Sequence, residues 1–257
     1  MNNFNQTDRY DFWNSRADLG LLAGTNDIIL KKMEIQEIAK HVHDGMKILD
    51  AGCGNGITAI YLAEKFNVTI VGVDFSDKMI ENAKRIAQEK KMKGAVTFLK
   101  DDVQDLSGLD RDFDFIYTER TLINLSTWDA QKKAIENIFS HHVKKGIYAM
   151  CESSMDGLNK INTLRASVDL PQITPPWHNR YLRDEEINTH TLQGITLESV
   201  NDFSSTYYFL SRVVNAHIAS NEGKEPDYNS IINQLALKLP PFGDFGQTKI
   251  WLWRKNE

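Results

Sequence analysis

Apolar residues recur along positions 1–151 in two alternating patterns. Short apolar runs, typical of buried strands, alternate with longer stretches in which apolar residues recur every three or four positions, the spacing of one helix face. The runs predict strands over residues 47–51, 68–74, 96–99, 113–117 and 146–151. The longer stretches predict helices over residues 27–43, 77–91 and 128–142, and another that starts at residue 57. This alternation predicts a doubly wound α/β fold, with a mostly parallel sheet and helices on both faces.

The alternation breaks after residue 151. Residues 152–195 form a polar insertion that contains prolines, and a connection this long in a compact domain is usually functional. Beyond it we expect a strand over 196–200, helices over 207–220 and 228–238, and an antiparallel last strand over 248–253. We therefore expect a single domain, residues 1–257. Its segments are an N-terminal lid and helix (1–45), a core (46–151), a substrate-cap insertion (152–195) and a C-terminal part that completes the sheet (196–257).

The amino-acid composition limits the kinds of partner that this protein is expected to bind. The 257 residues are 41% hydrophobic and 25% charged, ordinary for a globular protein, and the formal net charge of -5 argues against nucleic acid. No apolar run approaches the ~20 residues of a membrane span. Because the start, residues 1–6, is also unlike a signal peptide, we expect a cytoplasmic protein that binds no membrane. Cys53 and Cys151 lack zinc-ligand spacing, and we expect both to be reduced. The insertion with Trp251 and Trp253 could support a homodimer.

Glycine occupies alternate positions, Gly52, Gly54 and Gly56, between the first predicted strand and the helix after it. A loop without Cβ atoms lets a ligand lie against backbone N–H groups at a helix N-terminus, as nucleotide-like cofactors do. A dinucleotide is the simplest such ligand, but its motif has a third glycine where this chain has Ile57. Asp50 at the strand end would also repel a pyrophosphate and attract an ammonium group. These residues favour a cofactor with a positively charged end.

Acidic residues also follow the next two predicted strands, at Asp74 and Asp102. Together with the glycine loop, this order resembles the class I S-adenosylmethionine-dependent methyltransferases, whose sheet is Rossmann-like. The resemblance implies S-adenosyl-L-methionine as the cofactor, with the loop under its methionyl and ribose parts and Asp50 near the amino group. It also implies that Asp74 accepts hydrogen bonds from the ribose hydroxyls, and that Asp102 and the Val103 backbone meet adenine.

The same resemblance places further side chains at the cofactor. Phe75 and Met79 would flank adenine. Trp13 and Arg16 would either touch the cofactor, with Arg16 pairing its carboxylate, or make only capping contacts. Any single carboxylate of the set could instead be a helix N-cap, but three at successive strand ends favour ligand binding.

The acceptor should lie beyond the carboxyl ends of the strands, near the end of the fourth predicted strand. Glu119 there could be a general base, a cofactor contact or a structural acceptor for a lid. Arg120 could pair with Glu119 or hold an anionic substrate, and Asn124 follows in the same stretch. The sequence has no full set of oxygen ligands with recognisable spacing, so we expect no metal.

The insertion supplies a second wall for the substrate. Its side chains combine an aromatic platform, an imidazole and a cation, namely Trp177, His178, Arg180 and Tyr181. The alternative is a turn in which Trp177 packs and His178 caps a carbonyl. Residues 119–125 and the Pro-Trp-His-Asn run at 176–179 resemble methyltransferases of bacterial surface-polysaccharide assembly. That resemblance implies a sugar, nucleotide sugar or phosphorylated precursor as the small-molecule substrate.

The expected reaction is methylation of a hydroxyl oxygen, with His178 or Glu119 as the general base. An acceptor that is already anionic needs no base, and Arg120 and Arg180 would then orient its charge. Three alternatives remain open. They are an N-methyltransferase for an amino sugar, a nucleic-acid methyltransferase, which would need a basic aromatic channel, and a non-catalytic cofactor-binding scaffold.

Overall fold

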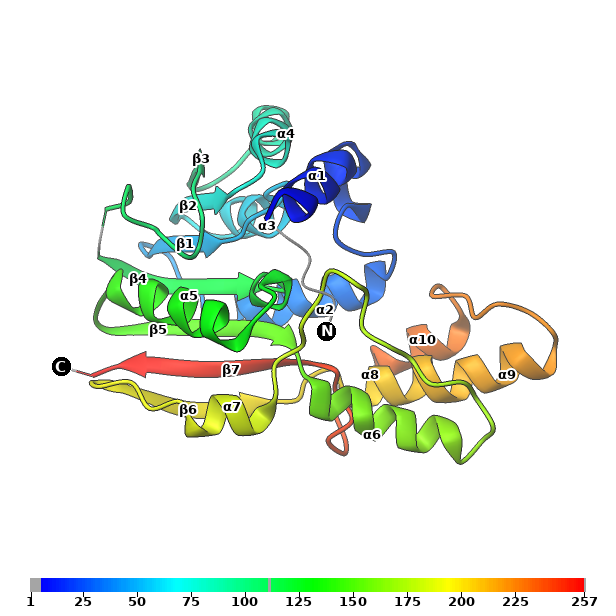
Figure 1. Cartoon of the computed structure of the whole chain (residues 1–257). Coiled ribbons are helices and arrows are strands. Elements are labelled where there is room, and N and C mark those ends of the chain that lie inside the picture. The colour runs from blue at the N-terminus through cyan, green and yellow to red at the C-terminus, as the bar shows by residue number, and fades with distance from the viewer. Residues whose placement is uncertain (1–5, 111, 257) are drawn as a thin grey trace.

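A seven-stranded sheet runs through the molecule in a computed structural model, which describes residues 6–110 and 112–256 (Figure 1). The strands are β1 (Lys47–Ala51), β2 (Thr69–Asp74), β3 (Ala95–Lys100), β4 (Phe113–Glu119), β5 (His142–Ser153), β6 (Ile195–Asn201) and β7 (Thr248–Lys255). They lie in the order β3-β2-β1-β4-β5-β7-β6. Strands β1 to β5 are parallel, and β7 lies antiparallel between β5 and β6. The predicted Rossmann-like fold with an antiparallel last strand is confirmed.

The helical elements alternate with these strands. They are α1 (Gln6–Arg16), η1 (Ala17–Leu22), α2 (Ile28–Ala39), α3 (Ile57–Lys65), α4 (Asp77–Gln88), η2 (Leu122–Asn124), α5 (Trp128–Ser140), α6 (Met155–Ala166), α7 (Asp184–Thr189), α8 (Ser205–Phe209), η3 (Leu210–Asn215), α9 (Ala216–Asn221) and α10 (Ile231–Ala236). η1 and η2 are 3-10 helices, and η3 is a π-helical turn that joins α8 to α9. Within the described ranges, no helix has both the length and the apolar character to cross a membrane. Residues 1–5, most of the polar start, lie outside those ranges.

Both faces of the central strands of the sheet are buried, and neighbouring residues of one strand pack into opposite cores. Ile48 of β1 belongs to the cluster formed with α2, α3 and α4, which includes Leu62. Leu49, the next residue, belongs to the cluster formed with α5 and α7, which includes Ile138 and Trp251. Full burial of an aliphatic side chain of this size contributes about 1.5–3 kcal/mol. The two clusters therefore hold the strands rigidly and fix the position of their carboxyl ends.

A third apolar cluster lies beyond the carboxyl ends of the parallel strands. There α6, α8, η3 and α10 gather around the start of α2, with Tyr207 and Tyr208 buried between them. Figure 1 shows this helical group on the side toward which β4 and β5 point, with α1 above the same edge of the sheet. The ends of the strands are thus enclosed by segments from both termini of the chain.

The insertion is more regular than its sequence indicated. Residues 152–195 contain α6 and α7, where we expected only a polar connection. Helix α6 begins after Ser154, whose Oγ accepts a hydrogen bond from the Gly157 N–H at 3.1 Å, and it buries Leu158 and Ile161. The prolines that indicated an irregular segment begin at Pro171, after this helix has ended. The other predicted helices are confirmed with shorter or shifted ends, and that over 207–220 contains the π-helical turn.

Candidate active site

The chain reverses between β1 and α3 through Gly52, Gly54 and Gly56, whose φ angles are 87°, 51° and 71°. Residues with a Cβ rarely adopt such angles. A Cβ on Gly52 would also overlap the Thr121 side chain, and one on Gly56 would overlap the Phe98 ring. The turn therefore requires glycine, and at Gly52 and Gly54 the bare backbone forms part of a pocket wall.

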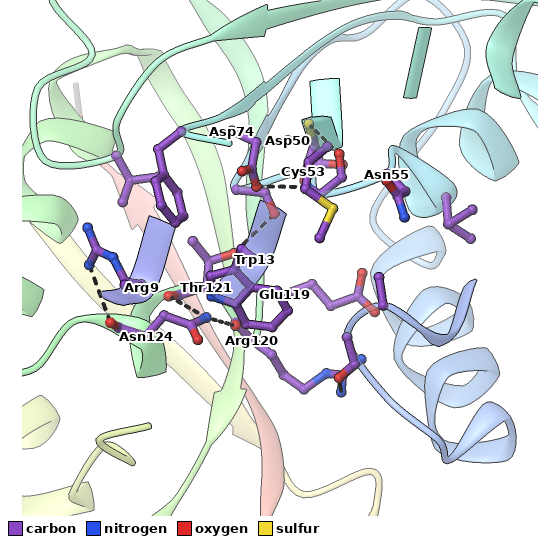
Figure 2. Close-up of a pocket in the computed structure, with 18 of the residues that line it drawn as sticks. Arg9, Trp13, Asp50, Cys53, Asn55, Asp74, Glu119, Arg120, Thr121 and Asn124 are labelled. Atoms are coloured by element: carbon purple, nitrogen blue, oxygen red, sulfur yellow. Dashed lines mark hydrogen bonds between the residues drawn. The ribbon is translucent and has the colours of Figure 1, made fainter. Parts of the chain in front are cut away.

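This pocket lies at the carboxyl ends of the parallel strands, and we call it the strand-end pocket (Figure 2). Its lining includes Trp13, Asp50, Gly52, Gly54, Asp74, Phe75, Met79, Asp102, Val103, Glu119, Arg120 and Asn124. All of these were predicted from the sequence as cofactor or substrate residues. The fold brings them to one place from the N-terminal helix, the glycine turn and the ends of four strands.

The carboxylates of Asp50 and Asp74 are buried in the wall of this pocket. The backbone N–H groups of Gly54 and Ser76 donate to the two oxygens of Asp74 at 3.0 and 2.9 Å. Burial raises the pKa of Asp74 to about 6 and that of Asp50 to about 7. A cation or a pair of hydroxyl donors would favour the ionised form of both groups. The pocket is therefore suited to a ligand that brings such partners.

Helix α1 contributes a cation to the pocket that the sequence analysis missed. The guanidinium carbon of Arg9 lies 4.9 Å from the centroid of the Phe75 ring, and NH2 of Arg9 lies 3.9 Å from Oδ2 of Asp102. Arg9 precedes Trp13 by four positions, a spacing that places both on one face of a helix. A helix predicted over residues 6–16 would have placed Arg9 and Trp13 on the same face. Arg9 thus stands beside the place predicted for adenine.

The glycine turn is tied to the N-terminal segment. Nδ2 of Asn55 donates to the carbonyl oxygens of Ala17 and Gly20 at 2.9 and 3.0 Å. The side chain of Asn55 is 5% exposed, so these bonds are shielded from water. Helix α1 and η1 are therefore held directly over the strand-end pocket, and Trp13 completes its wall.

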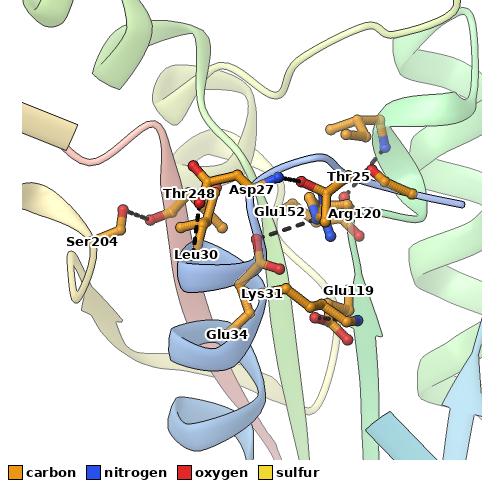
Figure 3. Close-up of polar contacts among 12 residues, drawn as sticks. Thr25, Asp27, Leu30, Lys31, Glu34, Glu119, Arg120, Glu152, Ser204 and Thr248 are labelled. Atoms are coloured by element: carbon orange, nitrogen blue, oxygen red, sulfur yellow. Dashed lines mark hydrogen bonds and ion pairs between the residues drawn. The ribbon is translucent and has the colours of Figure 1, made fainter. Parts of the chain in front are cut away.

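Glu119 at the end of β4 is part of a buried ion pair (Figure 3). Its Oε1 lies 2.7 Å from Nζ of Lys31, and its Oε2 accepts a hydrogen bond from Oγ1 of Thr58 at 2.5 Å. Burial acts to raise the pKa of Glu119, but the charges of Lys31 and Arg120 outweigh it and lower the pKa. The carboxylate is therefore ionised and already satisfied. Lys31, which lines the pocket, was not predicted, because nothing in the sequence of α2 places it opposite β4.

Arg120 follows Glu119 with a φ of 54°, a left-handed conformation that non-glycine residues seldom adopt. Its Nε lies 3.2 Å from Oε1 of Glu34, and its NH1 donates to the Gly24 carbonyl at 3.0 Å (Figure 3). Burial raises the pKa of Glu34, which has no exposed surface, to about 8. Such backbone conformations cluster at functional sites, where surrounding contacts maintain them.

Glu152 of β5 fixes the turn that carries Arg120. This carboxylate accepts hydrogen bonds from the N–H groups of Thr121 and Leu122, both at 3.0 Å, and of Ile123 at 3.3 Å. Burial raises the pKa of Glu152 to about 7. Three otherwise unpaired donors of η2 are satisfied by one side chain, so the loop after β4 is held rigidly.

A second cavity adjoins the strand-end pocket, and we call it the aromatic cavity. Its lining includes Phe12, Trp13, Arg16, Asp27, Arg120, Asn124, His178, Asn179, Tyr181, Tyr208, Arg212 and Tyr228. Five residues line both spaces, namely Trp13, Ala23, Gly24, Arg120 and Asn124. The two are therefore direct neighbours, separated by side chains of α1 and of the turn after β4.

His178 lies in an aromatic stack at the wall of this cavity. Its ring centroid is 4.2 Å from that of Phe12, 5.7 Å from that of Trp13 and 5.3 Å from that of Trp177. Burial lowers the pKa of His178 to about 4, so the imidazole is neutral at physiological pH. Trp177 is 51% exposed and packs its ring 5.4 Å from Phe12, outside the lining of either space.

Two predicted cations have other partners in this structure. Nε of Arg16 donates to the Ala23 carbonyl at 2.5 Å, so its contacts are capping contacts, although it also lines the aromatic cavity. NH1 of Arg180 donates to Oε2 of Glu186 at 3.0 Å and to Oε1 of Gln131 at 2.6 Å, and Arg180 lines neither space.

The remaining predicted residues divide between lining and support. The hydroxyl of Tyr181 accepts a hydrogen bond from Nε2 of Gln247 at 3.0 Å in the aromatic cavity. Gly56 lies behind the strand-end pocket, against Phe98.

Burial raises the pKa of the Cys53 thiol well above its usual value, which argues against a nucleophilic role. Over residues 6–110 and 112–256, no group of three or more His, Cys, Asp or Glu side chains is arranged to hold a metal ion.

Comparison with known proteins identifies the family. Residues 42–199, more than half of the chain, match the methyltransferase domain family. The chain therefore belongs to the methyltransferase domain family. The predicted protein class, a class I methyltransferase that uses S-adenosyl-L-methionine, is confirmed at this level.

Several curated methyltransferases share part of their sequence with this chain. It is 28% identical over 122 residues to sterol 24-C-methyltransferase erg6 of Aspergillus fumigatus, which is 44% of this chain and 32% of that protein. It is 34% identical over 94 residues to O-methyltransferase rstn1 of Aspergillus nomiae, or 37% of this chain and 40% of that protein. Phosphoethanolamine N-methyltransferase 1 of Arabidopsis thaliana is 34% identical over 102 residues, 40% of this chain and 20% of the relative. The matches thus span well under half of these relatives.

Solved structures resemble nearly the whole chain. The magnesium protoporphyrin IX methyltransferase of Synechocystis, solved with bound S-adenosylhomocysteine, has a TM-score of 0.61 at 16% identity, over 98% of this chain and 100% of that chain. A TehB-like methyltransferase from Corynebacterium glutamicum has a TM-score of 0.57 at 17% identity, with the same coverage of 98% and 100%. At such identities the likeness establishes the fold.

Proposed function

We propose that this protein transfers a methyl group from S-adenosyl-L-methionine to a hydroxyl oxygen of a small polar acceptor. The observation that carries the proposal is the set of three carboxylates, Asp50, Asp74 and Asp102, which lie at the carboxyl ends of β1, β2 and β3 and line one pocket. A pocket with this charge is suited to a cofactor that has a cationic end and several hydrogen-bond donors.

The side chains of the strand-end pocket fit this cofactor. Asp50 would bind its ammonium group, and Asp74 would accept hydrogen bonds from the two ribose hydroxyls. Asp102 would accept from the adenine amine, with Phe75 and Met79 on the faces of the ring. The glycine turn supports the fit, because a Cβ at Gly52 would meet Thr121 and narrow the pocket.

S-adenosyl-L-methionine supplies a methyl group on a sulfonium sulfur, which is already an activated electrophile. The protein then has to orient the acceptor oxygen and exclude water. Trp13, Arg120 and Asn124 line both spaces, so the acceptor oxygen would lie beside them. His178 has a neutral imidazole and would accept the proton of a hydroxyl. Glu119 is the second candidate, although its carboxylate is held by Lys31 in this structure.

Sugars are the acceptors that we propose first. The resemblance of residues 119–125 and of the Pro-Trp-His-Asn run at 176–179 to methyltransferases of surface-polysaccharide assembly favours a sugar, a nucleotide sugar or a phosphorylated precursor. Polar groups of Asn124 and Asn179 beside aromatic rings suit a hydroxylated ring.

Calorimetry with S-adenosylhomocysteine, followed by transfer of a labelled methyl group to a panel of free, phosphorylated and nucleotide-linked sugars, tests this function. We expect binding of the demethylated cofactor and labelling of at least one acceptor. Binding without transfer to any acceptor would favour a cofactor-binding scaffold. Absence of binding would contradict the assignment of the strand-end pocket.

A further inference from the structure

The aromatic cavity differs in charge from the pocket beside it. Of the described residues that line the strand-end pocket, five carry a carboxylate and three a cationic group. Of those that line the aromatic cavity, three carry a guanidinium group and one a carboxylate, namely Arg16, Arg120, Arg212 and Asp27. Because both spaces are partly closed to water, these charges are screened less than on an open surface. The acidic pocket suits a cationic cofactor, and its neighbour has the opposite character.

The single carboxylate of the cavity is already saturated. Asp27 is 3% exposed, and it accepts hydrogen bonds from the Leu30 N–H at 3.0 Å, from the Tyr207 hydroxyl at 2.6 Å and from NH2 of Arg212 at 2.6 Å. Three donors leave it little capacity to bind a cation in the cavity. Asp27 therefore positions Arg212 and the start of α2 and does not set the preference for a ligand.

Arg120 lies at the boundary of the two spaces. Its Nε is 3.2 Å from Oε1 of Glu34, and its NH1 donates to the Gly24 carbonyl at 3.0 Å. The carboxylate of Glu119 is engaged by Lys31 at 2.7 Å. Because a guanidinium has five N–H donors in a planar fork, these contacts leave donors of Arg120 that can bind an anionic ligand.

Arg212 is held by aromatic rings in the wall of the cavity. Its guanidinium carbon lies 4.6 Å from the ring centroid of Tyr228, 5.3 Å from that of Tyr208 and 5.9 Å from that of Tyr207. It belongs to the π-helical turn η3, and such turns occur frequently at functional sites. The cavity thus has aromatic walls together with cations from two elements, Arg120 after β4 and Arg212 in η3.

Three buried polar atoms of lining residues have neither a hydrogen-bond partner nor an ion-pair partner within the described part of the chain. They are Oδ1 of Asn124, Oδ1 of Asn179 and Nδ1 of His178. Buried polar atoms are nearly always paired in native proteins, and leaving one unpaired costs about 1–3 kcal/mol. Their gathering around one cavity indicates a ligand with hydroxyl or other donor groups.

We propose that the aromatic cavity is the acceptor site and that it binds an organic anion, a carboxylate or phosphate carried on a hydroxylated ring. Arg120 and Arg212 bind the anionic group, the aromatic walls contact the ring, and the hydroxyl is the oxygen that is methylated. This inference rests on the proposed methyltransferase function. In the transfer, the acceptor oxygen forms a bond to the methyl carbon as the bond from that carbon to sulfur breaks. Sulfur keeps the electron pair, and the hydroxyl proton passes to His178.

Matched pairs of probes that differ only in charge test the proposal. Protein saturated with S-adenosylhomocysteine is titrated with 4-hydroxybenzoate against 4-hydroxybenzyl alcohol, and with glucose 6-phosphate against glucose. We expect the anionic member of at least one pair to bind about tenfold more tightly, the value of one charge-assisted contact. The first pair reports a carboxylate and the second a phosphate, so the pair that shows the preference identifies the anionic group.

Substitutions of the cavity arginines test whether the preference for anionic probes arises in the aromatic cavity. Arg120→Gln and Arg212→Gln should each reduce it to about twofold or less, and Arg120→Lys should retain part of it. Arg85→Gln, on the exposed surface of α4, is the control and should leave it unchanged. Thermal unfolding, measured on every variant, shows whether the protein is folded; it is used because Arg120 also lines the strand-end pocket.

The outcomes separate this inference from the function on which it rests. Equal binding of both members of each pair, no binding of either anion, or a preference that survives both glutamine variants would overturn the anionic acceptor site. Affinity for S-adenosylhomocysteine would in those cases leave the methyltransferase function standing. Loss of that affinity in the unmodified protein would instead contradict the proposed function itself.

Discussion

Nζ of Lys31 lies 2.7 Å from Oε1 of Glu119, so the carboxylate at the end of β4 has an ion-pair partner from α2 before any acceptor arrives. The pair is shielded, because the Glu119 side chain is 5% exposed. Breaking a buried pair by removing one partner leaves the other charge uncompensated, which is costly. This relationship makes Lys31 a structural determinant of the site as well as part of its wall.

Lys31→Met should therefore destabilise the protein. We expect the free energy of unfolding to fall by about 3 kcal/mol, because the buried carboxylate of Glu119 would lose its ion-pair partner. Chemical denaturation measures the change. Lys32→Met, at the exposed neighbouring position on α2, is the control and should alter stability by about 0.5 kcal/mol or less. Equal effects of the two substitutions would show that the ion pair contributes nothing.

Asp74→Ala should weaken binding of S-adenosylhomocysteine by roughly a hundredfold. This corresponds to about 3 kcal/mol, the loss of two hydrogen bonds to a charged group. Calorimetry gives the affinity directly. Asp105→Ala removes an exposed carboxylate in the turn after β3 and should leave the affinity unchanged. Unaltered affinity in Asp74→Ala would reject the role proposed for this residue.

Binding of S-adenosylhomocysteine should strengthen as the pH rises from about 6 to 8. Burial raises the pKa of Asp50 to about 7 and that of Asp74 to about 6, and a ligand with an ammonium group and hydroxyl donors binds their ionised forms. Binding therefore releases protons, and the affinity should increase about tenfold over this range. Asp50→Asn should bind more weakly at pH 8 and show a flatter pH profile. A profile as steep as that of the unmodified protein would exclude Asp50 as the source.

Stability should fall as the pH rises toward 8, and Glu34 should account for part of the change. Burial raises its pKa from 4.5 to about 8, so between these values the folded protein holds a proton that the unfolded chain has released. A group with this shift stabilises the fold less as the pH rises. Glu34→Gln should flatten the decline in unfolding free energy as the pH rises from about 7 to 8. Glu81→Gln, exposed on α4, should leave the slope unchanged.

The double variant His178→Ala with Glu119→Gln tests whether a side chain takes the acceptor proton. For a hydroxyl acceptor, loss of the general base should lower kcat by about 10²- to 10⁴-fold. The two single variants show which residue is responsible, and we expect His178 to carry most of the effect because Lys31 already holds Glu119. Transfer at the full rate by the double variant would eliminate both residues as the base.

The sheet and the strand-end residues that line one pocket could be predicted because both depend on local sequence. Apolar runs mark β1 to β5, and Asp50, Asp74 and Asp102 stand at fixed positions relative to the runs. Parallel strands bring their carboxyl ends to one edge, so the order of these residues along the chain already implies their proximity.

The residues that the helices contribute to the two spaces could not be predicted in the same way. Arg9, Lys31 and Arg212 reach the two spaces from separate helices, and their positions depend on how those helices pack. Arg180 is the converse case. It lies in a segment that the sequence predicted to bind substrate, but its guanidinium donates to Glu186 and Gln131. A residue's type shows what it can bind, whereas the packing of α2, α7 and η3 decides what it does bind.

The Trp13 side chain lines both the strand-end pocket and the aromatic cavity. Its helix, α1, continues into η1, and Asn55 of the glycine turn donates to backbone carbonyls of η1. Any displacement of α1 therefore changes both walls together and disturbs the contact between Trp13 and His178. In the proposed reaction, exchange of the cofactor and departure of the methylated product would therefore both depend on the position of this one helix.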